Sequence, residues 1–513
     1  MRTNVLNEYI AEFPVDEHDE KLVENTHPPD WKNPIPSECY DLVVIGAGSG
    51  GLTAASMMAQ LGAKVAIIEK NLTGGVSLVT GCVPSKSIIR SSRMVAGMKN
   101  ADEFAGNCPN SVAANFKDVM DRMRRIRARI SIRDAVSELI EQGVEVFLGS
   151  ASFKSPNSVS VGDAVLKFKK CIIATGSKPE RPAIEGLEEA GYLTNLNIFN
   201  LTQLPKRFAV IGGGPLGCEL AQAFARLGSK VTIIQSEPKF LPREERDAAQ
   251  ILAFSLARDG LEVRLNTHVV SVKTNDSEKI LTLTSIGKSW ELAVDEIAIA
   301  IGREPVLEGL HLEKAGVKYD AKKGITVDEY LYTTNKRILA IGDAALPYQF
   351  THVAEATAEM AIRNAFFFGR RKFKDLVIPW CTYTDPEIAH VGMYVPEAIS
   401  KNIPVKTYTV PLNDVDRAIT EGEEQGFFKI TIREGSDKII GATVVSQHAG
   451  DLIGQLSMAI TCGVGLSDLA SVIFPYPTHA EAIKRIANQY RKDRLKPWMR
   501  KILEFLFKVK RKF

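Results

Sequence analysis

The sequence predicts an α/β protein with two Rossmann-like domains and a separate α+β domain toward the C-terminus. Apolar runs at 40–45 and 208–211 lead directly into glycines, as buried parallel strands do. Further strand-like runs end at Glu69, Thr175, Gln235, Gly302 and Gly342. Helix-like stretches lie between several of these runs, and this alternation is typical of parallel sheets covered by helices.

The pattern changes at about residue 376. The runs 427–432 and 439–445 indicate antiparallel strands, and helical segments follow them up to about residue 490. Residues 1–38 have few periodic apolar positions and end in prolines, so we expect an extended arm there. At roughly 150 residues per domain, a chain of 513 residues holds three or four domains.

The composition excludes several classes of protein. It is 45% hydrophobic and 24% charged, close to the average for a globular protein, which excludes collagens and disordered chains. Seven cysteines are too few for a secreted disulfide scaffold. No apolar run reaches about 18 residues, so no transmembrane helix is expected. The N-terminus is polar and acidic and resembles no signal peptide, so we expect a cytoplasmic protein.

The basic charge is concentrated in a tail, residues 491–513, which we call the basic tail. It holds ten Lys/Arg and two Asp/Glu, a balance of +8, so the other 490 residues carry 3 − 8 = −5. A weakly acidic body argues against nucleic-acid binding. The tail mixes cations with bulky apolar residues, which permits peripheral contact with an anionic membrane or packing of the tail as a helix on its own dimer.

The first glycine pattern predicts a dinucleotide site. Gly46, Gly48 and Gly51 form a G-x-G-x-x-G motif between a strand and a helical stretch. Such glycines allow a tight turn and a close approach of the backbone to a pyrophosphate at the helix N-terminus. Glu69 closes the next strand, 69 − 51 = 18 residues later, where an acidic side chain is expected to bind a ribose.

The second glycine pattern predicts a second dinucleotide. Gly212, Gly214 and Gly217 repeat the motif, and Gln235 takes the place of the acidic residue, again 18 residues later. A carboxylate there would favour NAD(H) by binding ribose hydroxyls and repelling a 2′-phosphate. Gln235 removes that repulsion without supplying a cation, which leaves NADH and NADPH open with a slight preference for NADPH.

Cys82 is a candidate redox thiol. Pro84 fits the first turn of a helix, so Cys82 stands at or just before a helix N-terminus. The helix dipole and the nearby Lys86 both favour the nucleophilic thiolate form.

Several ordered motifs resemble those of the pyridine nucleotide–disulfide oxidoreductases, which include glutathione reductase, dihydrolipoamide dehydrogenase and mercuric reductase. The resemblance covers residues 40 to about 490 and is closest to the mercuric-reductase-like branch. The motifs are the two glycine patterns, 81–86 (GCVPSK), 174–176 (ATG), 302–303 (GR), 340–343 (AIGD) and 477–481 (PTHAE).

The resemblance implies that the first glycine motif binds FAD and the second binds NAD(P)H. It implies that Asp343 meets the ribityl chain of FAD and that Lys86 lies by the flavin and pairs with Glu219. The remaining residues that it assigns are Thr175, Gly176 and Gly342 for FAD, and Gly302 and Arg303 for NAD(P).

The family also implies a division of the chain and a homodimer whose subunits complete each other's active sites. The expected segments are the N-terminal arm (1–38), the FAD domain (39–180 and 304–375), the NAD(P) domain (181–303), the dimerisation domain (376–490) and the basic tail.

The chain departs from the family at its redox pair. The family has Cys-x4-Cys, and Ser77 stands at the first position, since 82 − 77 = 5. Cys82 matches the cysteine beside the flavin, while the lost cysteine is the one that attacks the substrate. Serine forms no disulfide, so either Ser77 is natural and the enzyme runs other chemistry, or it replaces a cysteine in an engineered chain.

A second departure lies near the C-terminus. The disulfide reductases carry His-Pro-Thr-x-x-Glu, in which the histidine is the acid/base; here Tyr476 takes its place and Glu481 matches the glutamate. A tyrosine, with a pKa of about 10, is a poor general base at neutral pH. His479 is a conceivable substitute, although an ordinary surface or packing histidine is the simpler interpretation.

Mercuric reductase itself fits incompletely, because those enzymes need the inner cysteine pair and a second pair near the C-terminus. The tail has no cysteine, and we interpret the remaining cysteines as buried or incidental, with no metal-ligand cluster. They are Cys39, Cys108, Cys171, Cys218, Cys381 and Cys462.

These observations favour a homodimeric FAD enzyme that takes hydride from NAD(P)H and passes electrons, with or without Cys82, to a small acceptor: a metal ion, a disulfide or a quinone-type molecule. The alternative enzyme is a pyridine nucleotide transhydrogenase or diaphorase that uses no cysteine. A third hypothesis is a flavin-binding interaction module without turnover.

Overall fold

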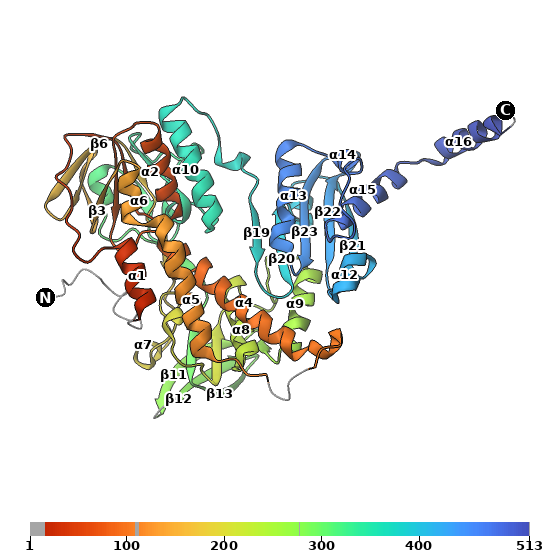
Figure 1. Cartoon of the computed structure of the whole chain (residues 1–513), viewed down its shortest axis with the longest axis horizontal. Coiled ribbons are helices and arrows are strands. Elements are labelled where there is room, and N and C mark those ends of the chain that lie inside the picture. Colours follow the sequence, from red (N-terminus) through yellow and green to blue (C-terminus); the bar gives the residue numbers. More distant parts are fainter. Residues whose placement is uncertain (1–15, 108–111, 276–277, 512–513) are drawn as a thin grey trace. The chain divides into compact units, whose positions relative to one another are not determined.

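A computed structural model describes residues 16–107, 112–275 and 278–511 (Figure 1). The chain forms two compact units. Within the described residues, the first unit runs up to Lys239 and resumes at Asp259–Leu376. The second unit contains Phe240–Arg258 and continues from Val377.

The first glycine motif belongs to a mainly parallel sheet in the first unit. Its strand order is β3-β2-β1-β6-β5-β4, and β18 also pairs with β6. The pairings β1–β2, β2–β3, β1–β6 and β6–β18 are parallel, as the buried apolar runs predict. The strands are β1 (Tyr40–Ile45), β2 (Val65–Glu69), β3 (Val144–Leu148), β4 (Ala151–Ser155), β5 (Ser158–Val161), β6 (Ala164–Ile173) and β18 (Ile338–Ala340).

Helices cover this sheet. α2 (Ser49–Gln60) and α10 (Thr351–Phe366) pack against each other, and their apolar side chains join a core with those of β1 and β2. α3 (Gly75–Val79) leads into α4 (Cys82–Lys99), which packs against α5 (Phe116–Ser131). The short helix α6 (Val136–Glu141) packs on β3.

The second glycine motif belongs to a four-stranded parallel sheet of order β10-β9-β8-β14. Its helix is α8 (Pro215–Leu227), which packs against both β9 and α4. Beside these strands in sequence lies an antiparallel sheet, β11-β12-β13. The strands are β8 (Arg207–Ile211), β9 (Lys230–Ile234), β10 (Glu262–Arg264), β11 (His268–Asn275), β12 (Glu278–Ser285), β13 (Lys288–Val294) and β14 (Glu296–Ile299).

Shorter elements complete the first unit. The two-stranded pairs are β7–β15 and β16–β17, and both are antiparallel. Their bounds, with that of a short helix, are β7 (Ser177–Pro179), α7 (Leu187–Ala190), β15 (Arg303–Pro305), β16 (Tyr319–Asp320) and β17 (Gly324–Ile325).

The second unit is α+β, as the change of pattern at about residue 376 predicts. Its five-stranded antiparallel sheet has the order β19-β20-β23-β22-β21. The strands are β19 (Pro379–Thr382), β20 (Glu387–Gly392), β21 (Val405–Pro411), β22 (Phe427–Arg433) and β23 (Ile439–Ser446). The helices are α9 (Arg246–Arg258), α11 (Val395–Ser400), α12 (Asp416–Glu421), α13 (Ala449–Cys462), α14 (Leu466–Leu469), α15 (Glu481–Asp493) and α16 (Pro497–Lys510).

α16 forms most of the basic tail, and none of its residues is buried. Its apolar side chains are therefore exposed to solvent. Among the described residues, no helix is both long enough and apolar enough to cross a bilayer.

The expectation of an extended arm over residues 1–38 is wrong over Glu17–Thr26, which form the helix α1, whereas residues 27–38 contain no helix or strand. The Asp16 carboxylate caps it by accepting hydrogen bonds from the backbone N–H groups of His18 and Asp19. Acidic residues in the first turn interact favourably with the helix dipole and so stabilise the helix further. α1 packs against α5.

A buried ion pair attaches α1 to α5. The Arg127 guanidinium lies 2.5 Å from the Asp19 carboxylate, and the two side chains are 0% and 4% exposed. Arg127 also donates to the Val79 carbonyl at 2.9 Å. Burial raises the pKa of Asp19 and lowers that of Arg127, while their mutual attraction opposes both shifts. The pair therefore stabilises the fold only while both charges are present.

We expect Arg127→Leu to destabilise the protein by about 3–5 kcal/mol, because it leaves the Asp19 charge buried without its partner. Thermal unfolding measures the change. Arg127→Leu combined with Asp19→Leu should recover part of the loss, since no buried charge remains. Lys21→Ala is the control, because the Lys21–Glu24 pair is exposed and is worth less than about 1 kcal/mol. A double variant no more stable than Arg127→Leu would contradict this account.

Candidate functional site

The first glycine motif forms a tight turn from β1 into α2. Gly46 has φ +102°, and a Cβ there would lie 2.4 Å from the Ala174 carbonyl oxygen. A Cβ on Gly51 would lie 1.8 Å from the Gly46 carbonyl oxygen, so only glycine allows the helix to start this close to the strand. Gly48 precedes the helix, and no side chain caps the first amides of α2. These amides are available to an anion.

Glu69, at the end of β2, ties this turn to its sheet. Its carboxylate accepts hydrogen bonds from the backbone N–H groups of Ala47, at 2.7 Å, and Asn71, at 2.8 Å. The side chain is buried, and burial raises the pKa of the Glu69 carboxyl while the two hydrogen bonds act in the opposite direction. Glu69, which is predicted to bind a ribose, is thus held in a fixed orientation beside the glycines.

The second glycine motif has the same three features: a tight glycine turn, an uncapped helix start and a hydrogen bond from the turn to the end of the next strand. Gly212 has φ +110°, a Cβ on Gly217 would lie 2.0 Å from the Gly212 carbonyl oxygen, and α8 starts after Gly214 without a side-chain cap. The Gln235 side-chain oxygen accepts a hydrogen bond from the Gly213 N–H at 2.7 Å, as Glu69 does from Ala47. Since its oxygen is the acceptor, the Gln235 NH2 group is left to act as a donor.

Both turns fit a dinucleotide. The first and last glycines of each motif leave no room for side chains, the helix N-termini present uncapped amides, and a polar side chain lies at each following strand end. These features are what a pyrophosphate and a ribose require.

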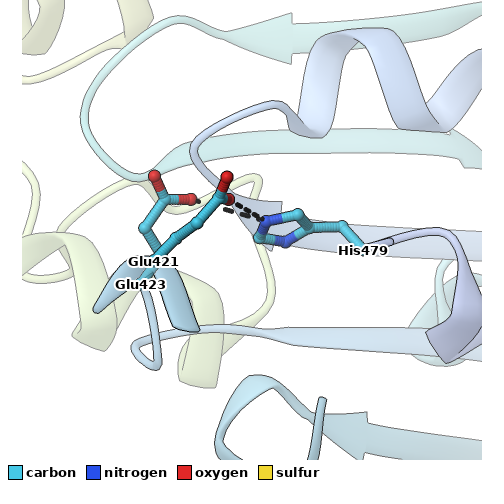
Figure 2. A group of neighbouring side chains, drawn as sticks. All are labelled: Glu421, Glu423 and His479. Carbon is cyan, nitrogen blue, oxygen red and sulfur yellow. Dashed lines mark hydrogen bonds and ion pairs between the residues drawn. The ribbon is translucent and has the colours of Figure 1, made fainter. Parts of the chain in front are cut away.

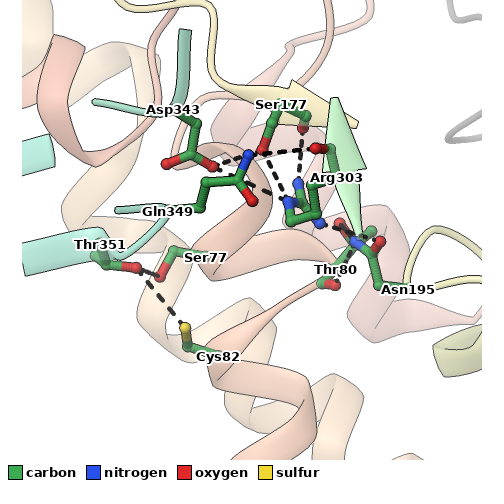
Figure 3. A network of polar contacts seen from close by, with 9 residues as sticks. All are labelled: Ser77, Thr80, Cys82, Ser177, Asn195, Arg303, Asp343, Gln349 and Thr351. Atoms are coloured by element: carbon green, nitrogen blue, oxygen red, sulfur yellow. Dashed lines mark hydrogen bonds and ion pairs between the residues drawn. The ribbon is translucent and has the colours of Figure 1, made fainter. Parts of the chain in front are cut away.

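Cys82 and Ser77 lie near the same threonine hydroxyl (Figure 3). The Ser77 Oγ is 3.0 Å from Thr351 Oγ1, and the Cys82 Sγ is 3.7 Å from that same oxygen. Cys82 is exposed and is the first residue of α4, after the N-cap Gly81. Thr351 is the first residue of α10. The positive ends of two helices therefore lie close to the thiol.

Lys86, one turn after Cys82, pairs with Glu219 of α8. The Nζ–Oε2 distance is 2.7 Å, and the Glu219 side chain is only 4% exposed. The ion pair that the family resemblance implies is therefore present. It connects the helix that carries Cys82 to the helix of the second glycine motif.

A polar network surrounds Asp343 (Figure 3). The Ser177 hydroxyl donates to the Asp343 carboxylate at 2.5 Å, and the Arg303 guanidinium donates to the Ser177 hydroxyl at 2.8 Å. Arg303 also donates to Asn195, which in turn donates to the Thr80 carbonyl. Burial raises the pKa of Asp343, while the hydrogen bond from Ser177 opposes that shift. The network holds the carboxylate in one position.

Arg303, predicted for NAD(P), therefore contacts residues around Asp343, the residue predicted for FAD. Its Nε lies 4.0 Å from the Asp343 carboxylate. The other predicted residues of these loops shape the backbone. Thr175 donates to the Val306 carbonyl at 2.7 Å, and Gly176, Gly302 and Gly342 all have positive φ.

Tyr476 and Glu481 lie in the second unit. Tyr476 is 71% exposed, and its hydroxyl donates to the Asp416 carboxylate at 2.9 Å. This hydrogen bond raises the pKa of Tyr476, which leaves still less of the basic tyrosinate form at neutral pH. Glu481 begins α15 and accepts from Arg485 at 3.1 Å.

His479 is a buried packing histidine and not a surface residue (Figure 2). Its Nε2 lies 2.9 Å from a Glu421 oxygen and 3.7 Å from a Glu423 oxygen. Three such ligand atoms within 4.8 Å of one another form a donor set that a divalent cation could use. Arg417 also pairs with Glu421, so ion pairing already accounts for this cluster, and we assign no metal to it.

The remaining described cysteines are free thiols. Burial raises the pKa of Cys171 and of Cys218, so neither is a reactive thiolate at neutral pH. Cys39 and Cys462 are exposed, Cys381 is partly buried, and Cys108 lies outside the described residues.

Sequence reasoning missed Thr351, Ser177 and Asn195. Thr351 is 269 residues from Cys82 in the chain, and no motif marks it. Ser177 follows the 174–176 motif directly, which is the one local signal that could have drawn attention to it.

Comparisons with known proteins agree with this geometry. The profile of the family described as "Pyridine nucleotide-disulphide oxidoreductase" matches residues 40–359, and that of its dimerisation domain matches 378–487. The mercuric reductase of Staphylococcus aureus is 33% identical over 454 residues, covering 88% of this chain and 83% of the relative. The dihydrolipoyl dehydrogenase of Thermus scotoductus is 34% identical over 472 residues, covering 88% and 98%.

Two solved structures are also similar. The HOCl-induced flavoprotein disulfide reductase RclA from Escherichia coli has a TM-score of 0.78 and 27% identity, covering 88% of this chain and 99% of RclA. LpdA from Mycobacterium tuberculosis has a TM-score of 0.80 and 26% identity, covering 88% and 99%. Members of this family use FAD and NAD(P)H. With its two glycine turns, its Lys86–Glu219 pair and a match over most of its length, the chain belongs to the pyridine nucleotide–disulfide oxidoreductases.

Proposed function

We propose that the protein is an FAD-dependent NAD(P)H oxidoreductase that passes electrons to a small acceptor at Cys82, acting as a single thiol. The observation that carries this proposal is the position of Cys82 at the start of α4, one turn before the Lys86–Glu219 pair. Bound FAD supplies the two-electron transfer between the nicotinamide and the acceptor. Gly46, Gly48, Gly51, Glu69 and Asp343 would hold it.

The surroundings of Cys82 suit a single thiol. Ser77, which replaces the family's second cysteine, shares a hydrogen bond with Thr351 at 3.0 Å. A serine hydroxyl cannot form a disulfide, so Cys82 has no intrachain redox partner at that position. Of the other described cysteines, Cys171 and Cys218 are buried.

Three acceptor classes follow from this chemistry: a metal ion, a disulfide and a quinone-type molecule. The names of the relatives include mercuric reductases and a flavoprotein disulfide reductase, which supports the first two. We also propose the domain assignment given above, with FAD held by 39–180 and 304–375, NAD(P) by 181–303, and a homodimer formed through 376–490, where the dimerisation-domain profile matches.

An anaerobic titration of the purified flavoprotein with NADPH and NADH tests this proposal. We expect the uptake of two electrons per subunit, because no Ser77–Cys82 disulfide exists to take up two more. Cys82→Ala should retain flavin reduction by NAD(P)H and lose turnover with the acceptor by at least about 100-fold. Uptake of four electrons would contradict the single-thiol proposal, and unchanged turnover of Cys82→Ala would favour a transhydrogenase or diaphorase.

We propose NADPH as the preferred nicotinamide. Gln235 binds the glycine turn through its oxygen, at 2.7 Å from the Gly213 nitrogen, and keeps its NH2 group as a donor. A donor favours a 2′-phosphate, whereas a carboxylate at this position repels it.

We expect Gln235→Glu to lower kcat/KM for NADPH relative to NADH by about tenfold or more, since the new carboxylate keeps the hydrogen bond to Gly213 and adds repulsion. Steady-state kinetics with both nucleotides measures this ratio. Gln250→Glu, an identical charge change on the exposed surface of α9, is the control. A ratio unaffected by Gln235→Glu would remove Gln235 from nucleotide selection.

We propose further that the basic tail contacts an anionic membrane surface peripherally. At 3.6 residues per turn, the polar side chains of α16 other than Lys510 gather on one face, and the apolar ones, with Lys510 among them, cover the rest. The polar face holds Arg500, Lys501, Glu504 and Lys508. The apolar members Trp498, Ile502, Leu503, Phe505, Leu506, Phe507 and Val509 are all 40% exposed or more. Such a helix suits the interface of an anionic bilayer.

We expect the protein to co-sediment at low salt with vesicles of phosphatidylserine and phosphatidylcholine, and not with phosphatidylcholine alone. Leu506→Glu should weaken binding by at least about tenfold, because it removes apolar burial and adds a repelled charge. Phe368→Glu, which changes an apolar residue outside the tail that is still more exposed (97% against 48% for Leu506), is the control. Equal sedimentation of a chain without residues 491–513 would exclude the membrane contact.

A further inference from the structure

An open hollow of about 380 Å³ lies along α4 and α5 in the first unit, and Cys82 is one of the residues that line it. The 81–86 motif supplies three of its lining residues, and no motif marks the others. Its lining residues are Cys82, Val83, Lys86, Ser87, Arg90, Arg122, Ile126 and Ile130.

Two helical stripes form the walls. Cys82, Lys86 and Arg90 are spaced four residues apart on α4, which puts them on one face of that helix. Arg122, Ile126 and Ile130 have the same spacing on α5. The two helices pack against each other, so the stripes share one groove.

The stripes run in opposite directions, which gives the hollow two different ends. Arg122 donates to the Ser87 carbonyl at 3.2 Å and lies 3.5 Å from the Ser91 hydroxyl, in the turns of α4 that carry Arg90. At the other end, Val83 and Ile130 pack against the apolar cluster of Leu22, Leu72, Leu78 and Val79. The Cys82 end is therefore apolar, and the Arg90 end is cationic.

The charges at the cationic end have no counterion in the described residues. The Lys86 charge is balanced by Glu219 at 2.7 Å. Within 16–107, 112–275 and 278–511, neither Arg90 nor Arg122 lies within ion-pair distance of a carboxylate. An anion in the hollow would supply the missing partner, and two guanidinium groups suit a carboxylate or a phosphate.

We infer that this hollow binds an anionic organic acceptor whose reducible group reaches Cys82 while its carboxylate or phosphate pairs with Arg90 and Arg122. The inference rests on the proposed use of Cys82. Arg90 is eight positions after Cys82 on α4, which corresponds to about 12 Å along the helix. The acceptor is thus an elongated small molecule with an apolar middle. A free metal cation is disfavoured, because two arginines line its approach.

Thiol-reactive probes test this directly. The holoenzyme is treated with dianionic 5,5′-dithiobis(2-nitrobenzoate) and with uncharged 4,4′-dithiodipyridine, and the modification rate of the Cys82 peptide is followed by mass spectrometry. We expect Arg90→Gln and Arg122→Gln each to lower the ratio of the anionic to the neutral rate about three- to fivefold. The neutral probe corrects for any change in the thiol itself.

Arg125→Gln and Arg129→Gln are the matched controls. Both remove the same charge from exposed positions of α5 that do not line the hollow, and we expect each to leave the ratio within about twofold. An unchanged ratio in Arg90→Gln and Arg122→Gln, or an equal fall in the controls, would overturn the inference. The probe reactions need no nicotinamide. Failure here is therefore distinct from failure of the proposed function, which the turnover of Cys82→Ala reports.

Discussion

The first unit depends on two places where a helix starts directly against the end of a strand. Gly51 faces the Gly46 carbonyl and Gly217 faces the Gly212 carbonyl, and a side chain at either glycine would collide with backbone. Because these contacts fix where α2 and α8 begin, they also fix where the uncapped amides point. Glu219 lies in the first turns of α8, so its ion pair with Lys86 carries this constraint to α4 and hence to Cys82.

The two departures from the family motifs have something in common. Ser77 and Tyr476 replace groups that the disulfide reductases use chemically, and each is engaged by a polar neighbour: Thr351 for Ser77 and Asp416 for Tyr476. A hydroxyl in a hydrogen bond, and a tyrosine whose pKa is raised further by that bond, add no thiol or base to the site. The chemistry of the described residues in the first unit is thereby concentrated on Cys82, Lys86 and Glu219.

Local patterns predicted what depends on neighbours in sequence. The strand runs and both glycine turns are present as expected, since each is marked by residues of a fixed type close together in the chain. The pair of Lys86 with Glu219 joins residues 133 positions apart, and it was expected from the family resemblance alone. Tertiary contacts were not predictable in this way. Thr351 meets Cys82 only because α10 starts beside α4, and Arg303 contacts Ser177 because β7 and β15 pair.

The helix α1 was missed for another reason. Few apolar residues repeat along it, so periodicity gave a weak signal. The Asp16 cap and the acidic first turn could still have predicted the start of a helix. Its stability comes from the buried contact between Asp19 and Arg127, which lies 108 residues away in the chain.

The two atoms of the Gln235 amide have different tasks: the oxygen holds the glycine turn, and the nitrogen is the group proposed to meet the nucleotide. Its oxygen holds the glycine turn, at the same 2.7 Å with which Glu69 holds the other turn, and its nitrogen faces away from that bond. Exchange of the nitrogen for an oxygen leaves the turn intact, and in the genetic code glutamine and glutamate differ by one base. If Gln235 selects the nicotinamide as proposed, folding and cofactor preference can evolve independently here, so a lineage can cross from one nicotinamide pool to the other without passing through an unstable intermediate.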